Sequence, residues 1–556
     1  MQGFASHLVP ILLIVLSMWP ILPRRSWIPF YNAMMQNWYL VLYICFVLFF
    51  IGIVHYSENI GRFSISIGGT KTVAAYLFIL LFSYLLLSYN YTMGVNDYAI
   101  SRYGDTVSFF TQAKMFAGGF LKVPSPANKE FYNTISCVNN GDYYGKYPPG
   151  WAGLLALGIL LHLPWVLNPI LTVLTVLIIF LLGVRFYDRN TAWIASILAG
   201  TSGIVMWGAM GYFSDTFAMF ASTLFIYCIV RVLESSSRLF SVIAGISLGV
   251  LFLTKPYPAV AIAIPAFLYS ISYLRTNRKL LACGVIVVAV FLPFIALLLL
   301  YNQMVTGMAL LFPHTLYHPG GRLGFGLRSD DVFFPLKYFG PLDLPRNFLQ
   351  TCYELNCYGI PFCLLFIAFI FWLPRKKGDW LMLLAIGSFV LLYFAYYGVT
   401  IRYYLPVIFA LALASARGLY NLGRVVSGYR VTGGRIGMTC ACFLAGSFLW
   451  TVIIPNNRQD YKEQKFRIDP FISVKKNKLE NAVVILRSTP KVYWNYPEHD
   501  ATFYTQNAPD FNGPLLFVRD LGEKNKTLKL SYPNRRIFFY DYDFSRGKST
   551  LSEWKQ

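Results

Sequence analysis

Ionisable side chains border several long apolar runs of this chain, and they are the first guide to its chemistry. Asp105 lies in the segment SRYGDTVSFFTQAKMF, and Lys146 lies in GDYYGKYPPGW, directly before two prolines. Lys255 in FLTKPYP and Arg402 in TIRYYLP also stand where apolar runs end or begin. Because charged groups at a bilayer are costly, such residues mark candidate functional sites.

One carboxylate among several cations suits group transfer from a phosphate. Asp105 can act as a general base that removes the proton of an acceptor hydroxyl. The cations Lys146, Lys255 and Arg402 can stabilise the charge that develops on a leaving phosphate, and their depth matches a lipid headgroup. Apolar helices around them would hold a polyprenyl tail. We therefore expect transfer of a sugar from a polyprenyl-phosphate donor.

Each of these residues also has an ordinary structural explanation. Lys146 and Lys255 could extend to the interface as amphipathic side chains, and Arg402 could anchor the topology. Asp215, a candidate second acid together with Asp142, could cap the start of its helix. The remaining candidates for contact with substrate in the outer loops are Tyr147, His314, His318 and Arg322. No metal ligand is assigned; a divalent metal cofactor is a less favoured alternative.

The elements that must position these residues are membrane helices. The chain has 556 residues, of which 56% are hydrophobic and 13% charged, whereas soluble proteins carry roughly a quarter charged residues. Apolar runs near 20 residues recur, each long enough to cross a bilayer. We expect an all-α polytopic membrane protein with about 13 transmembrane helices. The expected spans are 6–23, 37–56, 72–90, 166–184, 191–209, 213–233, 239–255, 257–274, 279–301, 358–374, 380–400, 402–420 and 437–455.

The run 150–163 begins after two prolines and is too short for a comfortable span, so we expect an interfacial helix there. With this helix not crossing, five clusters of Lys and Arg fall on one face, which should be cytoplasmic. These clusters also explain the net charge of +22 without nucleic acid as a partner. Loops 91–149 and 302–357 and the tail 456–556 then share the opposite face. The protein is expected in a bacterial inner (plasma) membrane, with its site on the periplasmic side.

The chain divides into three parts by composition. Residues 1–71 hold two additional N-terminal membrane helices, and residues 72–455 form the transmembrane core with its large outer loops. The tail 456–556 is polar and contains the β-like runs AVVIL, PLLFV and RIFFYDY between turn formers. About 100 residues suffice for a small domain, so we expect an extramembrane α/β domain there.

The order of these features resembles a known group. An Asp in the first outer loop, then KYPPG opening a short helix, then a span ending in GVRFYDR, is similar to the GT-C membrane glycosyltransferases. The branch it resembles most contains protein O-mannosyltransferases, lipid A aminoarabinose transferases and bacterial members of unassigned substrate. Further similar runs are FLTKP (252–256), YNxxxTG (301–307), RLGFG (322–326) and RYYLP (402–406).

The resemblance implies roles for individual residues. Asp105 matches the acidic position that the family uses as the catalytic base, and Lys146 falls at or beside the lysine that contacts the lipid phosphate. Lys255 and Arg402 match basic positions of the outer face. The family usually has a second carboxylate after the first-loop Asp, whereas Thr106 stands here. This departure argues against a metal bridging two carboxylates, and leaves three alternatives: Asp105 acts alone, another acid completes the site, or catalysis is impaired.

Two other functions fit parts of the pattern. A lipid or glycan transporter or flippase would also be polytopic, but such proteins often show repeated halves and mid-membrane polar residues, which this sequence lacks. A non-catalytic membrane subunit of polysaccharide assembly would retain the fold without the chemistry, as Thr106 would allow. The acceptor is left open between a glycan, a lipid and a protein.

Overall fold

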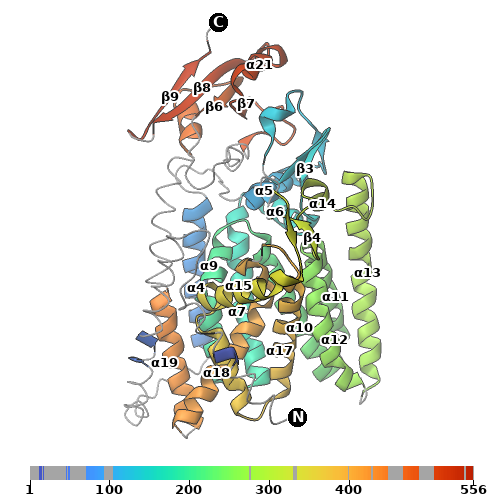
Figure 1. Ribbon diagram of the computed structural model, residues 1–556, viewed down its shortest axis with the longest axis vertical. Helices are drawn as coiled ribbons and strands as arrows, with labels where there is room; N and C mark the ends of the chain where they lie inside the picture. Colours follow the sequence, from blue (N-terminus) through green and yellow to red (C-terminus); the bar gives the residue numbers. More distant parts are fainter. Residues whose placement is uncertain are drawn as a thin grey trace.

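The computed structural model describes residues 12–14, 17, 45–46, 48–49, 70–92, 104–134, 136–274, 277–329, 335–398, 400–427, 430–448, 468–487, 506–543 and 546–554. In Figure 1 the helices form one thick layer, with small sheets and the C-terminus at one end of it. The two helices expected within 6–23 and 37–56 lie almost wholly outside the described residues.

The helices of the layer confirm a polytopic membrane protein. Seven described helices are long and apolar enough to cross a membrane, or up to nine if each bent pair counts as one span. The expected number of 13 is therefore not confirmed. The helices of the layer are α4 (Thr70–Thr92), α7 (Leu167–Phe186), α8 (Arg189–Gly200), α9 (Gly203–Met210), α10 (Ser214–Ser235), α11 (Arg238–Thr254), α12 (Pro256–Leu274), α13 (Lys279–Thr306), α15 (Leu344–Glu354), α16 (Cys363–Ala368), α17 (Lys377–Phe394), α18 (Ile408–Ser427) and α19 (Arg430–Phe448).

Two expected spans are broken rather than straight. The span expected at 191–209 consists of α8 and α9, which are bent by 55°, and the region of 358–374 belongs to a helix pair bent by 104°. The second bend occurs where Pro361 cannot continue a helix and Phe362 adopts a φ of +61°. The two breaks contact each other, because the Ser202 hydroxyl donates to the Gly359 carbonyl at 2.7 Å. That bond satisfies a main-chain group which the bend leaves free.

Helix α18 lies at the centre of the layer. It follows a 3-10 turn, η7 (Ile401–Val407). In the span formed by η7 and α18, 94% of the apolar 18-residue stretch is buried inside the protein. Its sequence FALALASARG is rich in small residues, which allow helix backbones to approach closely. Gly418 of α18 faces the main-chain carbonyl of Phe366 in α16, so that a Cβ at this position would collide with it.

The Gly418→Ala variant is therefore expected to destabilise the protein. The colliding atom is main chain and cannot rotate away, so α16 or α18 must shift, at a cost of about 1–3 kcal/mol. Thermal unfolding of the purified protein in detergent measures this effect. Gly446→Ala in α19 is the matched control, because no atom lies within 4 Å of its added Cβ; an equal loss of stability in both variants would contradict the close contact.

The outer loop before α7 is a folded unit. Helix α5 (Gly104–Ala117) leads into the small antiparallel strands β1 (Val123–Pro124), β2 (Cys137–Asn139) and β3 (Asp142–Gly145), in the order β1-β3-β2. After β3 comes α6 (Pro149–Leu160), the short apolar helix expected at 150–163. Its length of 12 residues agrees with a helix that does not cross the membrane.

The later outer loop, 302–357, is partly helical. Helix α13 extends to Thr306, and α14 (Pro313–Tyr317) follows it. A two-stranded antiparallel sheet, β4 (Gly326–Arg328) with β5 (Lys337–Phe339), precedes α15. Helix α15 begins the bent pair, so much of this loop belongs to the helical layer.

The C-terminal region forms a mixed sheet. Its strands are β6 (Ala482–Leu486), β7 (Leu515–Arg519), β8 (Arg536–Asp543) and β9 (Lys548–Glu553), in the order β7-β6-β8-β9. β6 is parallel to both neighbours, pairing Val484 with Phe517 and with Phe538, while β8 and β9 are antiparallel. With α21 (Lys526–Ser531) this is the expected small α/β arrangement. The expected strands AVVIL, PLLFV and RIFFYDY correspond to β6, β7 and β8; the polar β9 was not expected.

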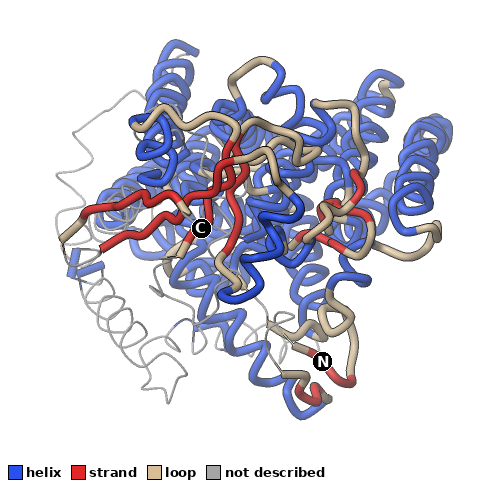
Figure 2. Tube along the Cα trace, turned by 90° about the horizontal axis from the view of Figure 1, so that it is seen from above, coloured by secondary structure: helices blue, strands red, loops and turns tan. Residues whose placement is uncertain are grey.

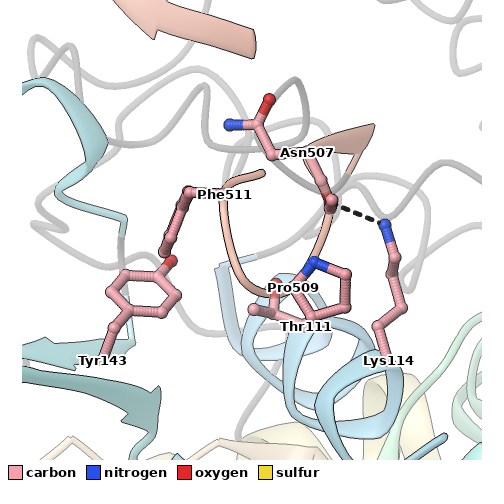
Figure 3. Close-up of a pocket in the computed structure, with 7 residues that line it drawn as sticks. Thr111, Lys114, Tyr143, Asn507, Pro509 and Phe511 are labelled. Carbon is pink, nitrogen blue, oxygen red and sulfur yellow. Dashed lines mark hydrogen bonds between the residues drawn. The ribbon is translucent and has the colours of Figure 1, made fainter. Parts of the chain in front are cut away.

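The C-terminal sheet packs on the outer loop. Seen from above, it lies over the helical layer (Figure 2). Met115 and Tyr143 of the loop share one apolar core with Val483 and Phe511 of the C-terminal region. Figure 3 shows this junction, in which the Lys114 ammonium of α5 donates to the Asn507 carbonyl at 2.8 Å. The C-terminal region therefore contacts the helix that carries Asp105.

The basic clusters gather at the opposite end of the layer. Arg185 in the last turn of α7 pairs with Glu234 near the end of α10 at 2.9 Å. Lys376 lies 5.7 Å from the ring centroid of Tyr187, and Lys377 lies 5.0 Å from that of Tyr273. These contacts bring together two of the basic clusters counted in the sequence, one at the end of α7 and one at the start of α17.

Candidate functional site

Asp105 lies in the first turn of α5, on the end of the layer that carries the outer loops. A carboxylate is favourable at a helix N-terminus, because the unpaired N–H groups there carry partial positive charge. Apolar residues recur through the turns that follow it, and Val107, Phe109 and Phe110 are buried. Helix α5 is thereby fixed against α6, with Asp105 at its accessible end.

Two of the three predicted cations surround this carboxylate. Arg402 Nη1 lies 2.6 Å from Asp105 Oδ2, and Lys146 Nζ lies 3.9 Å from Oδ1. The hydroxyl of Tyr147 also donates to Oδ1. Burial alone would raise the pKa of Asp105, but the charges of Arg402 and Lys146 and the hydrogen bond from Tyr147 hold it well below its usual range. Asp105 is therefore ionised at neutral pH.

Lys146 is positioned by the junction of β3 and α6. Its main-chain N–H donates to the Ser136 carbonyl at 3.2 Å. Pro148, with its φ fixed by the ring, then starts α6, where the buried Trp151 donates to the Tyr212 carbonyl at 2.8 Å. The Lys146 ammonium lies 4.7 Å from the ring centroid of Tyr317 and is only 7% exposed. The rigid corner thus holds the cation beside Asp105.

Arg402 is positioned by α15. The carboxylate of Glu354, near the end of α15, accepts a hydrogen bond from the main-chain N–H of Ile401, the residue before Arg402. Gln350, one turn earlier, donates to the same carboxylate at 2.7 Å. The bent helix pair therefore supports the first turn of η7, and through it the guanidinium that contacts Asp105.

Glu354→Ala is expected to lower the transfer rate by roughly tenfold, because loss of a supporting contact typically costs about 1–2 kcal/mol. The variant should fold, since the supported N–H can be solvated at this half-buried position. The readout is the turnover number with saturating donor, compared with that of Glu523→Ala, an exposed carboxylate of the C-terminal region. Equal turnover in both variants would show that Arg402 holds its position without α15.

The third predicted cation, Lys255, forms a second ion pair nearby. Lys255 follows the last turn of α11 and lies 2.6 Å from Oδ1 of Asp215, in the first turn of α10. Asp215 is buried. Its carboxylate pairs with Lys255, and no side-chain hydrogen bond caps the start of α10, which was the alternative role expected for Asp215. The Tyr403 ring lies 5.4 Å from the Arg402 guanidinium and 5.8 Å from the Lys255 ammonium. One ring thereby connects both ion pairs.

The histidines and the second acid have different positions. His314 of α14 is half-buried near Lys146, and its partial desolvation together with that charge lowers its pKa to about 3. It is therefore neutral at physiological pH. The His318 ring lies 3.2 Å from the Ser329 carbonyl. Asp142 stands at the start of β3, at the far end of that strand from Lys146, and pairs with Lys122 at 2.7 Å.

Arg322 lies in the turn between α14 and β4, and the neighbouring loop is organised by another arginine. Arg328 donates to the carbonyls of Gly324 and Phe325, at 3.2 and 2.6 Å. The structure therefore assigns Arg328 a role in loop folding. The ion pairs around Asp105 and Asp215 do not include Arg322.

The residues around Asp105 do not fit a divalent metal ion. Within the described ranges, no group of three or more His, Cys, Asp or Glu side chains is arranged to hold one. The neighbours of Asp105 are Arg402 and Lys146, which compete with a cation for the same oxygens. Thr106, in place of a second carboxylate, is buried within α5.

An apolar groove of about 310 Å³ opens between three membrane helices, α11, α12 and α13. Phe252 of α11 lines the groove. It lies about one helical turn before Lys255, so one end of the groove is about one turn from the second ion pair. Its other lining residues are Leu248, Ala259, Val260, Ala263, Ile264, Phe267, Leu268 and Phe291. Because these lining residues are apolar, the groove suits a hydrocarbon chain that is a few atoms wide.

Sequence reasoning missed several residues of the site. Ser136, Tyr317 and Glu354 contact the network but carry no charge cluster or motif of their own. Tyr403 lies within the run RYYLP, whose aromatic residues could have drawn attention to it. The others are brought in by contacts between distant segments, for which one sequence gives no signal.

One protein-family model matches part of the chain. Residues 162–297 match the family described as dolichyl-phosphate-mannose-protein mannosyltransferase. No curated protein sequence matches the chain.

Solved structures are also similar to the chain. ArnT from Cupriavidus metallidurans bound to undecaprenyl phosphate has 12% sequence identity and a TM-score of 0.51, with 84% of this chain and 92% of that chain covered. The apo form of an Archaeoglobus fulgidus oligosaccharyltransferase has 12% identity and a TM-score of 0.49, with 84% and 69% covered. At such low identity the likeness to ArnT establishes the fold. The chain therefore has the fold of the GT-C membrane glycosyltransferases and resembles their branch of protein mannosyltransferases and ArnT.

Proposed function

We propose that the protein is an integral membrane glycosyltransferase that transfers a sugar from a polyprenyl-phosphate donor to an acceptor hydroxyl. The observation that carries the proposal is the network in which Asp105 contacts Lys146 and Arg402, with Lys255 across the Tyr403 ring. A base and several cations on one end of a membrane layer are what this reaction requires. ArnT, whose fold the chain shares, is known bound to undecaprenyl phosphate.

The proposed step is a single displacement at the anomeric carbon. The acceptor oxygen forms a bond to that carbon while its proton passes to Asp105. The bond from the carbon to the phosphate oxygen breaks, and its electron pair stays on the phosphate. Lys146, Arg402 and Lys255 stabilise the charge that develops there. Displacement in line inverts the configuration at the anomeric carbon.

The donor's apolar tail is proposed to lie in the groove between α11, α12 and α13. The groove opens beside the lipid-facing side chains of α12 and begins one turn from Lys255. A phosphate near Lys255 would then be joined to a tail running down α12. Neutral His314 and the Tyr147 hydroxyl, both next to Lys146, are candidates for hydrogen bonds to the sugar or the phosphate.

The site is proposed to face the periplasm of a bacterial inner membrane. The basic clusters lie at the opposite end of the layer, which the charge rule assigns to the cytoplasm. The C-terminal region, residues 456–556, is proposed as a separate domain on the same side as the site. Because it packs on α5, it can cover the site or contact an acceptor.

The proposal is tested with purified protein in nanodiscs and radiolabelled polyprenyl-phosphate sugars, offered with glycan, lipid and protein acceptors. Label is expected to leave the donor and to appear in one class of acceptor. Lys146→Met is expected to weaken binding of polyprenyl phosphate roughly tenfold, because a charge-assisted contact is lost. Lys526→Met, an exposed lysine of the C-terminal region, is the matched control. Failure of every donor to bind would refute the proposed function.

A further inference from the structure

Each carboxylate oxygen of Asp105 contacts a cation that, in the proposed function, binds the donor's phosphate. Arg402 contacts Oδ2 at 2.6 Å, and Lys146 lies 3.9 Å from Oδ1. Oδ1 also accepts from the Tyr147 hydroxyl, and from the Ser136 hydroxyl at 3.4 Å. Each contact stabilises the ionised carboxylate, and a carboxylate stabilised in this way is a weak base. Both oxygens of the proposed base are thus engaged by neighbouring side chains.

We propose that Asp105 masks the phosphate-binding cations in the donor-free protein, and that the donor's phosphate displaces it from Arg402. This inference rests on the proposed function and adds a regulatory step to it. A guanidinium donates paired N–H bonds to a carboxylate or to a phosphate in the same geometry, so Arg402 keeps a charge-assisted contact throughout the exchange. Asp105 becomes free to accept a proton only when a donor is present.

The charges of the network are consistent with this exchange. Lys146, Lys255 and Arg402 carry three positive charges, while Asp105 and Asp215 carry two negative ones, which leaves one positive charge. The phosphodiester of a polyprenyl-phosphate sugar carries one negative charge and neutralises it. During transfer the phosphate gains a charge while Asp105 gains a proton. The network therefore stays balanced from bound donor to bound product.

The second ion pair is suited to remain closed during the exchange. The Asp215 carboxylate is almost fully buried, whereas about a fifth of the Asp105 side chain is exposed. Separating a buried pair leaves uncompensated charges, which is costly. Asp105 is therefore the carboxylate that a phosphate arriving from outside can displace.

The test measures binding of polyprenyl monophosphate to protein in nanodiscs of zwitterionic lipid, with the uncharged polyprenol as the control for the tail. Asp105→Asn removes the competing charge but keeps the shape of the side chain. It is expected to bind the phosphate roughly tenfold more tightly than wild type, the factor for about 1.4 kcal/mol, and to bind polyprenol equally. Glu523→Gln makes the same chemical change at an exposed site and should bind like wild type. Asp105→Ser serves if the asparagine variant does not fold.

A second arm separates masking from a general electrostatic effect. If Asp105 competes through Arg402, the gain from Asp105→Asn should largely disappear in an Arg402→Gln background, which a double-mutant cycle detects. A gain that persists unchanged there, or an Asp105→Asn variant that binds no better than wild type, would overturn the masking and leave the proposed function intact. If no variant prefers polyprenyl phosphate over polyprenol, both proposals fall.

Discussion

Asp105→Asn is expected to reduce the rate of sugar transfer by roughly 10²–10⁴-fold, the usual contribution of a positioned general base. The amide cannot accept the acceptor's proton, although it fills the same space beside Arg402 and Tyr147. The loss should appear in the turnover number and not as weaker donor binding, because the substitution leaves Arg402 and Lys146 in place to bind the donor's phosphate. Single-turnover transfer of label from the donor, at saturating concentration, measures it.

Two controls support that result. Glu523→Gln, an isosteric change at an exposed carboxylate, is expected to turn over at the wild-type rate. Asp215→Asn removes the other carboxylate of the network, which is paired with Lys255. If Asp215→Asn abolished transfer while Asp105→Asn did not, the general base would be Asp215 on α10 rather than Asp105.

Lys255→Met is expected to lower the stability of the folded protein, with the largest effect of any single change in the network. It leaves the Asp215 carboxylate almost fully buried and without its partner at 2.6 Å. Breaking a buried pair in this way costs about 3–5 kcal/mol, and the partial exposure of Lys255 places the expected loss near the lower end. Thermal unfolding in detergent measures it.

The double variant Lys255→Met/Asp215→Asn distinguishes the ion pair from simple packing. Because the asparagine carries no charge, most of the lost stability should return. Lys526→Met, in an exposed pair of the C-terminal region, should leave the midpoint unchanged. A double variant as unstable as Lys255→Met would mean that the lysine stem, rather than its charge, stabilises this junction.

The positions of the charged site residues were predictable because the membrane restricts them. Asp105, Lys146, Lys255 and Arg402 all stand at helix ends on one face, where a charge is tolerated. The turn after Lys146 was predictable too, since two prolines fix where α6 begins. The structure brings Asp105, Lys146 and Arg402 together, although more than 250 residues separate the last two in the sequence.

The partners of those residues were not predictable from one sequence. Asp215 has the position of a helix cap, and only the approach of α11 makes it the partner of Lys255. Glu354 reaches Ile401 because a helix pair bends by 104°, and the period of apolar residues does not report such a bend. Likewise, β9 is a polar edge strand, whose pairing with β8 is set by the sheet rather than by its own composition.

The most direct test of Asp105 as the catalytic base is one single-turnover experiment with the labelled polyprenyl-phosphate sugar that binds wild-type protein. Wild type and Asp105→Asn are loaded with equal amounts of bound donor, the acceptor that takes up label with the wild type is added, and the loss of label from the lipid is followed over time. Wild type is expected to transfer the sugar, whereas Asp105→Asn is expected to retain the donor unchanged for at least a hundredfold longer. Equal rates from equal bound donor would contradict Asp105 as the base.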